Sequence, residues 1–531
     1  MNRRKFVTGL GAAAAAAGAI QTPADGASLR TAEAADAAAR MKPDFDPVER
    51  SIAELQDAQA RGAASGESLT SAYLQRIERL NRQGPRLAAV LAVNPDAMGI
   101  ARALDEERAQ GKIRGPLHGI PILLKDNIET RDPLPTTAGS LALMGARHSQ
   151  DSPMAARLRA AGAVFIGKAN LSEWANFRST RSTSGWSGVG GQTRCPYDPA
   201  RNPSGSSSGP ASAASANLCA AAIGTETDGS VLAPASINGL VGMKPTVGLV
   251  SSEGIVPISS RQDTAGPMTR SVVDAATLLS VMAAPRHDWP AIRLPLEAAP
   301  KGLRLGLMQS PPSTHPQVAR EWQEWLKLLQ REGFTLVDVP TPPQWPTLLD
   351  LELEVLLYDF KADLNAYLAR LDGTVPVHTL AGIIEFNRAH AAAEMPYFGQ
   401  ELFEQAQARG SRDSPAYREA LRRLLDAADT HGLAAIFDRY RIDALVASGN
   451  GPAELIDHVW GDRYENSGGW PPMCSAAAIA GYPSLTVPAG MVDGLPVGIQ
   501  FVARRLAEDT LLRIGLRFER AMQGRRQPPL A

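Results

Sequence analysis

The chain has 531 residues, and its 54 lysines and arginines nearly balance its 55 aspartates and glutamates. This balance provides no broad electrostatic field, so we expect neither nucleic acid nor an anionic membrane as a partner and favour a small neutral ligand. The three cysteines are well separated without CxxC spacing, and the sequence contains no HExxH motif. We therefore expect no metal and no cofactor, while a Cys195–Cys474 disulfide remains open.

The N-terminus has the pattern of an export signal. Arg3 and Arg4 precede Phe6 and a Gly/Ala-rich stretch that is only mildly hydrophobic, and an A-x-A site follows at residues 32–34. Twin arginines before such a stretch are typical of the route that exports folded proteins. The alternative is a disordered alanine-rich tail. We predict a signal over residues 1–34, a soluble bacterial protein that is periplasmic or secreted, and no membrane contact after export.

Residues 35–531 are predicted to form one large domain of the α/β class. Apolar residues at helical spacing over residues 69–80 follow Ser68, the expected N-cap, and predict an amphipathic helix. A second helix is expected over residues 153–158, followed by a buried strand over residues 163–166. Such alternation of helix and strand is typical of α/β proteins.

The alternation returns later in the chain. Strands over residues 303–308 and 334–339, with a helix over 318–329 between them, predict a βαβ unit with parallel strands. Residues from about 347 to 438 are charged and almost free of strand signals, so they predict several helices laid over the core. Near the C-terminus, the Asp493-Gly494 pair predicts a turn between two core strands.

Three segments carry residues suited to nucleophilic chemistry. The segment 115–129, GPLHGIPILLKDNIE, places Lys125 at the end of an apolar run and predicts a buried strand there. The segments 202–212, NPSGSSSGPAS, and 224–235, GTETDGSVLAPA, are loops rich in serine and glycine. A serine needs a base to take its proton, and a desolvated lysine loses its own proton near neutral pH. The tight turn at residues 228–230 can point backbone N–H groups at an oxyanion.

These segments resemble, in this order, the amidase signature family of serine hydrolases. The family pattern is a lysine after GIP(I/V)xxKD, a GGSSGGSAA loop, and GTDxGGSIRxPA. Residues 239–251, 263–276 and 480–503 also resemble family segments, so the resemblance covers most of the chain from about residue 47 and is weakest between about 290 and 440. It implies an α/β fold with a large mixed β-sheet flanked on both sides by helices, and hydrolysis of carboxamide C–N bonds through an acyl-enzyme.

The resemblance also implies a Ser-cisSer-Lys triad. In it Ser230 is the acylated nucleophile, Ser206 is the bridging serine on a cis peptide, and Lys125 is the base. The oxyanion hole would be formed by backbone N–H groups of consecutive residues: Thr227, Asp228, Gly229 and Ser230. The weakly matching helical region, about 347–438, would shape the choice of substrate.

The chain departs from the family pattern around the nucleophile. It has Glu226 for the usual aspartate, Asp228 for a glycine, and Val231-Leu232 for Ile-Arg; Pro210 also interrupts the serine loop. Losing the arginine removes a cation that could bind a substrate carboxylate. Asp228 adds a carboxylate beside the predicted oxyanion hole, which suits neutral or amine-bearing substrates. The segment 224–230, GTETDGS, resembles the corresponding segment of secreted peptide amidases. These enzymes convert C-terminal peptide amides to peptide acids and ammonia.

Three other functions remain as alternatives. The first is a broad aliphatic or aryl amidase, and the second is an ammonia-generating component of an amidotransferase. The third is a binding protein whose catalytic site has decayed. The expected partner is a small-molecule or peptide amide, and we expect a monomer. Trp470, beside two prolines, is either a packing anchor or part of the acyl pocket.

Two rival motifs have weaker support. Residues 205–209 match G-x-S-x-G, which would make Ser207 the nucleophile, but the preceding prolines argue against the strand that such an elbow needs. Residues 162–168, GAVFIGK, resemble a phosphate-binding loop but form an apolar, strand-like run with Ala169 where Ser or Thr is needed.

Overall fold

The structure, a computed structural model, describes residues 45–530 except 287, 309–314, 372 and 464–471. The predicted export signal and Trp470 lie outside the described residues. Among the helices that the structure does describe, none is long and apolar enough to cross a membrane. The cysteines Cys195, Cys219 and Cys474 are buried free thiols, so the bridge left open by the sequence is not formed.

The core is a mixed sheet of 11 strands, with a separate two-stranded sheet beside it. Across the main sheet the order is β1 (Val90–Val93), β3 (Ala163–Ala169), β2 (Ile120–Lys125), β6 (Ala221–Glu226), β8 (Thr264–Thr269), β7 (Val241–Lys244), β12 (Ser484–Val492), β13 (Leu495–Ala503), β11 (Ala444–Ser448), β9 (Arg304–Met308) and β10 (Thr335–Val339). The small sheet pairs β4 (Trp186–Ser187) with β5 (Gly191–Gln192). Strand β2 runs parallel to both β3 and β6, and β9 runs parallel to β10 and β11.

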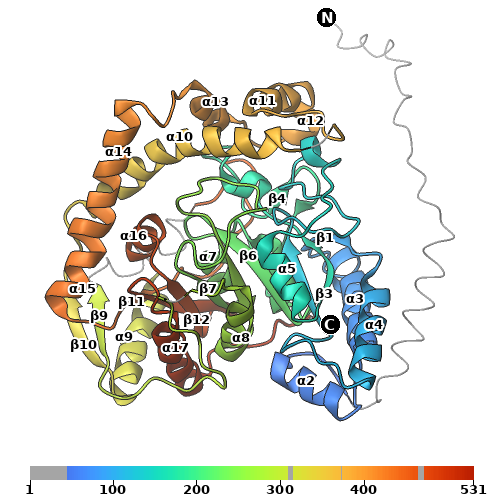
Figure 1. Ribbon diagram of the computed structural model, residues 1–531. Coiled ribbons are helices and arrows are strands. Elements are labelled where there is room, and N and C mark those ends of the chain that lie inside the picture. Colours follow the sequence, from blue (N-terminus) through green and yellow to red (C-terminus); the bar gives the residue numbers. More distant parts are fainter. Residues whose placement is uncertain (1–44, 287, 309–314, 372, 464–471, 531) are drawn as a thin grey trace, which may run out of the picture.

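Helices surround this sheet (Figure 1). They are α2 (Ile52–Ala60), α3 (Gly66–Arg76), α4 (Ala97–Ala109), α5 (Pro153–Ala160), α6 (Ser208–Ser215), α7 (Leu232–Ile237), α8 (Val272–Met282), α9 (Pro316–Arg331), α10 (Leu348–Ala369), α11 (Leu380–Ala389), α12 (Ala391–Glu394), α13 (Glu401–Ala408), α14 (Pro415–Leu425), α15 (Ala434–Tyr440), α16 (Pro472–Ala480) and α17 (Glu508–Met522). Helices α10 to α14 form an arc along the outside of the core, coloured yellow to orange in Figure 1.

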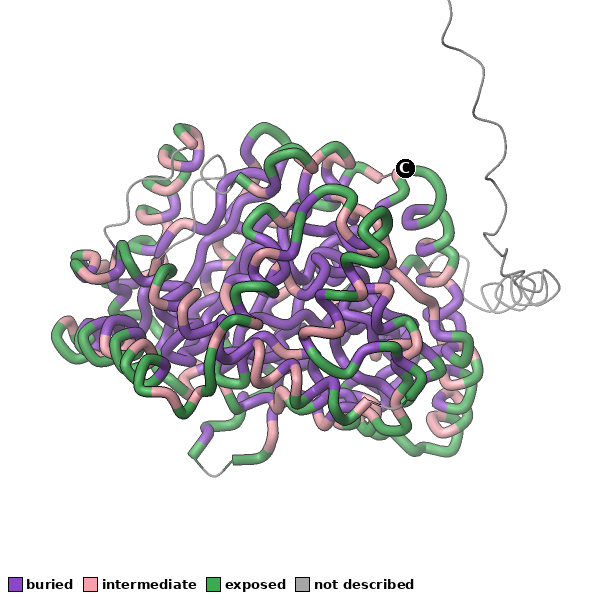
Figure 2. Tube along the Cα trace, turned by 90° about the horizontal axis from the view of Figure 1, so that it is seen from above, coloured by how far each residue is buried: buried purple, intermediate pink, exposed green. Residues whose placement is uncertain are grey.

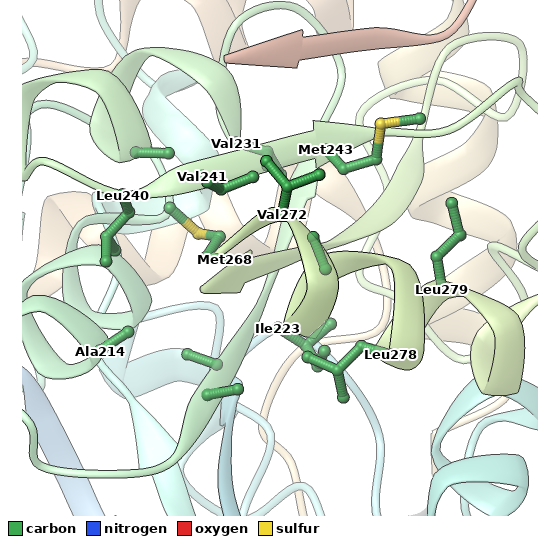
Figure 3. Close-up of a cluster of buried hydrophobic side chains, with 14 of the residues drawn as sticks. Ala214, Ile223, Val231, Leu240, Val241, Met243, Met268, Val272, Leu278 and Leu279 are labelled. Atoms are coloured by element: carbon green, nitrogen blue, oxygen red, sulfur yellow. The ribbon is translucent and has the colours of Figure 1, made fainter. Parts of the chain in front are cut away.

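Both faces of the sheet are covered. Along β11, Ala444 and Val446 belong to one hydrophobic cluster, while the alternating Leu445 and Ala447 belong to another. Because side chains of a strand alternate between faces, two separate clusters mean that both faces are buried. Figure 3 shows part of the first cluster, where side chains of β6, β7 and β8 meet those of α8. Buried residues fill the interior, and exposed residues lie at the periphery (Figure 2).

The elements predicted from hydrophobic spacing are present. Helix α5 leads into β3, β9 and β10 pair in parallel around α9, and β12 and β13 form an antiparallel hairpin. One predicted cap is wrong: α3 begins after Ser65, because the Ser65 hydroxyl accepts from Ser68 N at 3.1 Å and the Ser68 hydroxyl accepts from Ser65 N at 2.8 Å. This reciprocal capping box places Ser68 inside the first turn.

Candidate active site

Lys125 is the last residue of β2, in the part of the sheet where neighbouring strands run parallel. Every residue of β2 is buried, and the Lys125 side chain has no exposed surface. The apolar run before it forms the strand because a strand covered on both faces excludes polar residues. The lysine therefore projects from a rigid strand end into the protein interior, as the sequence predicts.

The Lys125 ammonium is surrounded by uncharged oxygen atoms. Its Nζ lies 2.9 Å from Ser206 Oγ, 3.1 Å from Ser207 Oγ and 2.9 Å from Thr225 Oγ1. It also contacts the Thr225 carbonyl at 3.3 Å. Asn127 Nδ2 donates to the same Thr225 hydroxyl at 3.0 Å, which fixes that hydroxyl in place. The structure thus brings the two sequence-predicted residues Lys125 and Ser206 within hydrogen-bond distance.

Burial lowers the pKa of Lys125 to about 7. Desolvation is the dominant cause, because the charged form loses its hydration inside the protein. The negative charges of Asp263 and Glu226 act in the opposite direction and raise this pKa. A lysine with a pKa near neutrality is suited to act as a general base at physiological pH.

Ser206 lies in the irregular segment between Arg201 and α6, and the Gly205–Ser206 peptide bond is cis. Ser206 is fully buried, and its carbonyl accepts from Ser172 N at 3.1 Å. A side chain at position 205 would meet the Ser172 hydroxyl and would lie 2.7 Å from Ser184 Oγ. Only glycine fits there, so Gly205 lets the chain pass close to these serines.

Ser207 does not have the setting of a nucleophile elbow. The residues immediately before it, 202–206, are irregular and not in a strand, and Ser207 itself is fully buried. The hydroxyl donates to the Thr225 carbonyl at 3.0 Å and accepts from Thr225 N at 3.1 Å, so it links the start of α6 to β6.

The segment that resembles a phosphate-binding loop is part of the sheet. Its residues 163–168 lie in β3, where Lys168 Nζ donates to the Ile128 carbonyl and to Thr136 Oγ1.

Ser230 lies in the turn between β6 and α7. Gly229 has a φ of 75°, which a glycine adopts without strain. One oxygen of Glu226 accepts from Val231 N at 2.8 Å and from Leu232 N at 3.0 Å, so the carboxylate closes the turn on itself. Ser207 N donates to the Ser230 carbonyl at 3.2 Å, which joins this turn to the serine loop. Ser230 is 8% exposed.

Sequence reasoning missed several residues that support the site. Asp263 accepts from Thr227 Oγ1 at 2.6 Å through one oxygen. Its other oxygen accepts from Ile258 N at 2.8 Å and Ser259 N at 3.0 Å. Burial raises the pKa of Asp263 to about 7. Asp263 is the first residue of the segment 263–276, which resembles the family, and this resemblance could have drawn attention to it. Nothing in the local sequence connects Asp263 to Thr227.

The candidate site presents amine and hydroxyl groups. Among the described residues, no group of three or more His, Cys, Asp or Glu side chains is arranged to hold a metal ion. The arrangement instead offers a buried amine beside a serine hydroxyl, and a tight turn that carries a second serine. A serine hydroxyl beside an amine is suited to acyl transfer.

Comparison with known proteins identifies the family of this chain. Residues 68–512 match the family model described as Amidase. A native peptide amidase from Stenotrophomonas maltophilia is 45% identical in its solved structure, with a TM-score of 0.83 over 91% of this chain and 99% of that chain. A probable amidase of Arabidopsis thaliana is 38% identical over 92% of this chain and 93% of its own length.

A component of the glutamyl-tRNA(Gln) amidotransferase of Chloroflexus aurantiacus is 34% identical over 90% of this chain and 98% of its own length. With the fold, these similarities define the class of protein as an amide-hydrolysing enzyme. The chain belongs to the amidase signature family.

Proposed function

We propose that this amidase removes ammonia from the C-terminal amide of peptides through an acyl-enzyme on Ser230. The observation that carries the proposal is the buried Lys125 amine, 2.9 Å from Ser206 Oγ and with a pKa of about 7. In the proposed cycle neutral Lys125 accepts the Ser206 proton while Ser206 accepts that of Ser230. Ser230 Oγ then bonds to the amide carbonyl carbon.

Backbone N–H groups at residues 227–230 stabilise the resulting oxyanion. The intermediate collapses when the C–N bond breaks, and the relay returns the proton to the leaving nitrogen, which departs as ammonia. Water then attacks the Ser230 ester by the same relay and releases the peptide acid. All proton transfers are internal to the site, so the cycle needs no further reactant than water.

The similar peptide amidase and the acidic Asp228 support the substrate class. A cavity of about 450 Å³ borders Arg201, but none of the residues that line it belongs to the proposed catalytic set, so it does not mark the position of the scissile amide. It is lined by Arg201, His315, Pro452, Ala453, Glu454, Leu455, Ile456, Asp457 and Arg463. We propose that the enzyme acts as a monomer, without nucleic acid, in the periplasm or outside the cell.

Incubation with C-terminally amidated peptides is expected to convert the terminal amide to the acid while internal peptide bonds stay intact. Mass spectrometry would show a gain of about 1 Da per peptide, because –NH2 is replaced by –OH. Unchanged peptides, together with ammonia release from simple aliphatic or aryl amides, would overturn the substrate class and leave amide hydrolysis in place.

A second candidate is an ammonia-generating component of an amidotransferase, favoured by the similarity to the glutamyl-tRNA(Gln) enzyme. That function would supply ammonia to a tRNA-bound partner. Release of ammonia from an amide only in the presence of partner proteins and charged tRNA would support it over the peptide amidase. The near-zero net charge of the chain argues against a tRNA-binding surface of its own.

The activity is expected to fall at acidic pH. Protonated Lys125 cannot accept a proton, so kcat/KM for an uncharged amide should drop about tenfold per pH unit below a pKa of about 7. The charge of Asp263 raises the Lys125 pKa, so an Asp263→Asn variant is expected to shift this acidic limb to lower pH. A flat profile between pH 5 and 8 would contradict the role of Lys125; the pH range is roughly that in which a group of this pKa titrates.

A further inference from the structure

Helix α10 brings a second carboxyl group, besides that of Asp228, to the turn of residues 227–230 that is proposed to bind the oxyanion. Glu352, in the first half of α10, is 5% exposed and forms a side-chain hydrogen bond with Asp228. Gln262 Nε2 donates to Glu352 Oε1 at 2.6 Å. The same nitrogen lies 3.3 Å from the Thr227 carbonyl oxygen. The helical region, where the sequence resembles the family least, therefore contacts the residues that precede Ser230.

The hydrogen bond between the two acids fixes their protonation. An ionised carboxylate only accepts hydrogen bonds, so a carboxyl pair that shares one must hold a proton. Burial and the neighbouring Asp228 charge both raise the pKa of Glu352 well above its usual range. Glu352 is therefore the protonated member, which donates to Asp228 and accepts from Gln262.

The contacts converge on one peptide unit. The Thr227 carbonyl and the Asp228 N–H belong to the same planar peptide group, so holding the carbonyl fixes the direction of the N–H. Gln262 holds the carbonyl end, and Glu352 holds the side chain of the residue that carries the N–H. A hydrogen bond to a carbonyl also polarises the attached N–H and makes it a better donor.

We propose that Glu352 and Gln262 are positioning residues that orient the Thr227–Asp228 peptide as a donor to the oxyanion. This inference rests on the proposed function, since it requires an oxyanion at this turn. It assigns the helical region a second task besides shaping the substrate site. The energetic reason is that a donor contributes to catalysis only when it already points to where charge develops.

The pair is also expected to make activity depend on its shared proton. Loss of its proton leaves two adjacent carboxylates that repel each other and pull Asp228 away from its position. Other titratable groups that interact with Asp228 belong to neighbouring elements: Glu226 at the end of β6, Lys244 at the end of β7 and Cys474 in α16. Lys244 is the cation of this set, and burial lowers its pKa to about 8, so its charge offsets the repulsion only below that pH.

The test compares Glu352→Leu, Glu352→Gln and Gln262→Met on a C-terminally amidated peptide. E352L and Q262M are expected to lower kcat about 10- to 100-fold while KM changes less than about threefold, because misaligning a donor costs less than removing it. E352Q can donate to Asp228 and accept from Gln262, so it should recover most of that loss. E352Q should also remove the part of the pH dependence that comes from this proton, because its amide does not titrate.

A matched control separates positioning from folding. Asp274→Leu also removes a buried carboxyl group, but Asp274 lies in α8, where it accepts from Ile52 N at 2.9 Å. D274L is expected to lower the thermal unfolding temperature without a loss in kcat per folded molecule.

E352L and Q262M with wild-type kcat, or E352Q as impaired as E352L, would overturn the positioning role. An active Ser230→Ala variant would instead overturn the proposed function itself, so the two failures can be distinguished.

Discussion

Replacing Ser230 by alanine is expected to lower kcat/KM for a peptide amide by about 10⁴-fold or more, because the acyl-enzyme can no longer form. This loss corresponds to about 5.5 kcal/mol of transition-state stabilisation. Ser230 is only slightly exposed and lies in a turn closed by Glu226, so alanine removes one hydroxyl without changing the turn. Ammonia release and covalent labelling by a fluorophosphonate probe would measure the effect.

The matched control is Ser207→Ala, which removes the other serine hydroxyl near Lys125. Ser207 bonds to the backbone of β6, so its loss is expected to reduce stability and activity but to leave probe labelling on Ser230. Peptide mapping of the labelled protein identifies the modified serine. Labelling of Ser207 in the wild type, or full activity of the Ser230→Ala variant, would contradict the assignment of the nucleophile.

The strands that carry the site were predictable because their signals are local. The apolar run that ends in Lys125 could only satisfy its hydrophobic side chains as a buried strand, and β2 is buried throughout. The hairpin of β12 and β13 was equally predictable from the sequence, because an Asp-Gly pair favours the positive φ angles that such a turn requires. Asp493 and Gly494 both adopt positive φ there. Short-range chemistry of this kind needs no knowledge of the tertiary fold.

The remaining site contacts depend on how distant elements pack. Thr225 is an ordinary strand residue until Lys125, from the neighbouring strand, is placed against it. In the sequence, Glu352 is one of several acidic residues in a helical segment, and its contact with Asp228 exists only because α10 packs against the turn before Ser230. The Ser65 cap was missed for a local reason, because two serines three residues apart can each be read as the N-cap.

Replacing Lys125 by methionine is expected to lower kcat by about 10³-fold or more, because no other group in the lysine's place can accept the Ser206 proton. Methionine keeps an unbranched apolar chain in the buried position, so the packing of β2 changes little. The residual activity should also lose its acidic limb. Initial rates of ammonia release from pH 5 to 8 would test both results; the range covers roughly one to two units on each side of the pKa.

Lys168→Met provides the matched control, since Lys168 is also buried and lies opposite Leu124 on the adjacent strand β3. Its Nζ donates to Thr136 Oγ1 at 3.1 Å and to the Ile128 carbonyl, away from the serines. Leaving these acceptors unpaired is expected to cost about 1–3 kcal/mol of unfolding free energy while kcat is retained. An equal loss of kcat in both variants would mean that Lys125 acts through the stability of the sheet and not as a base.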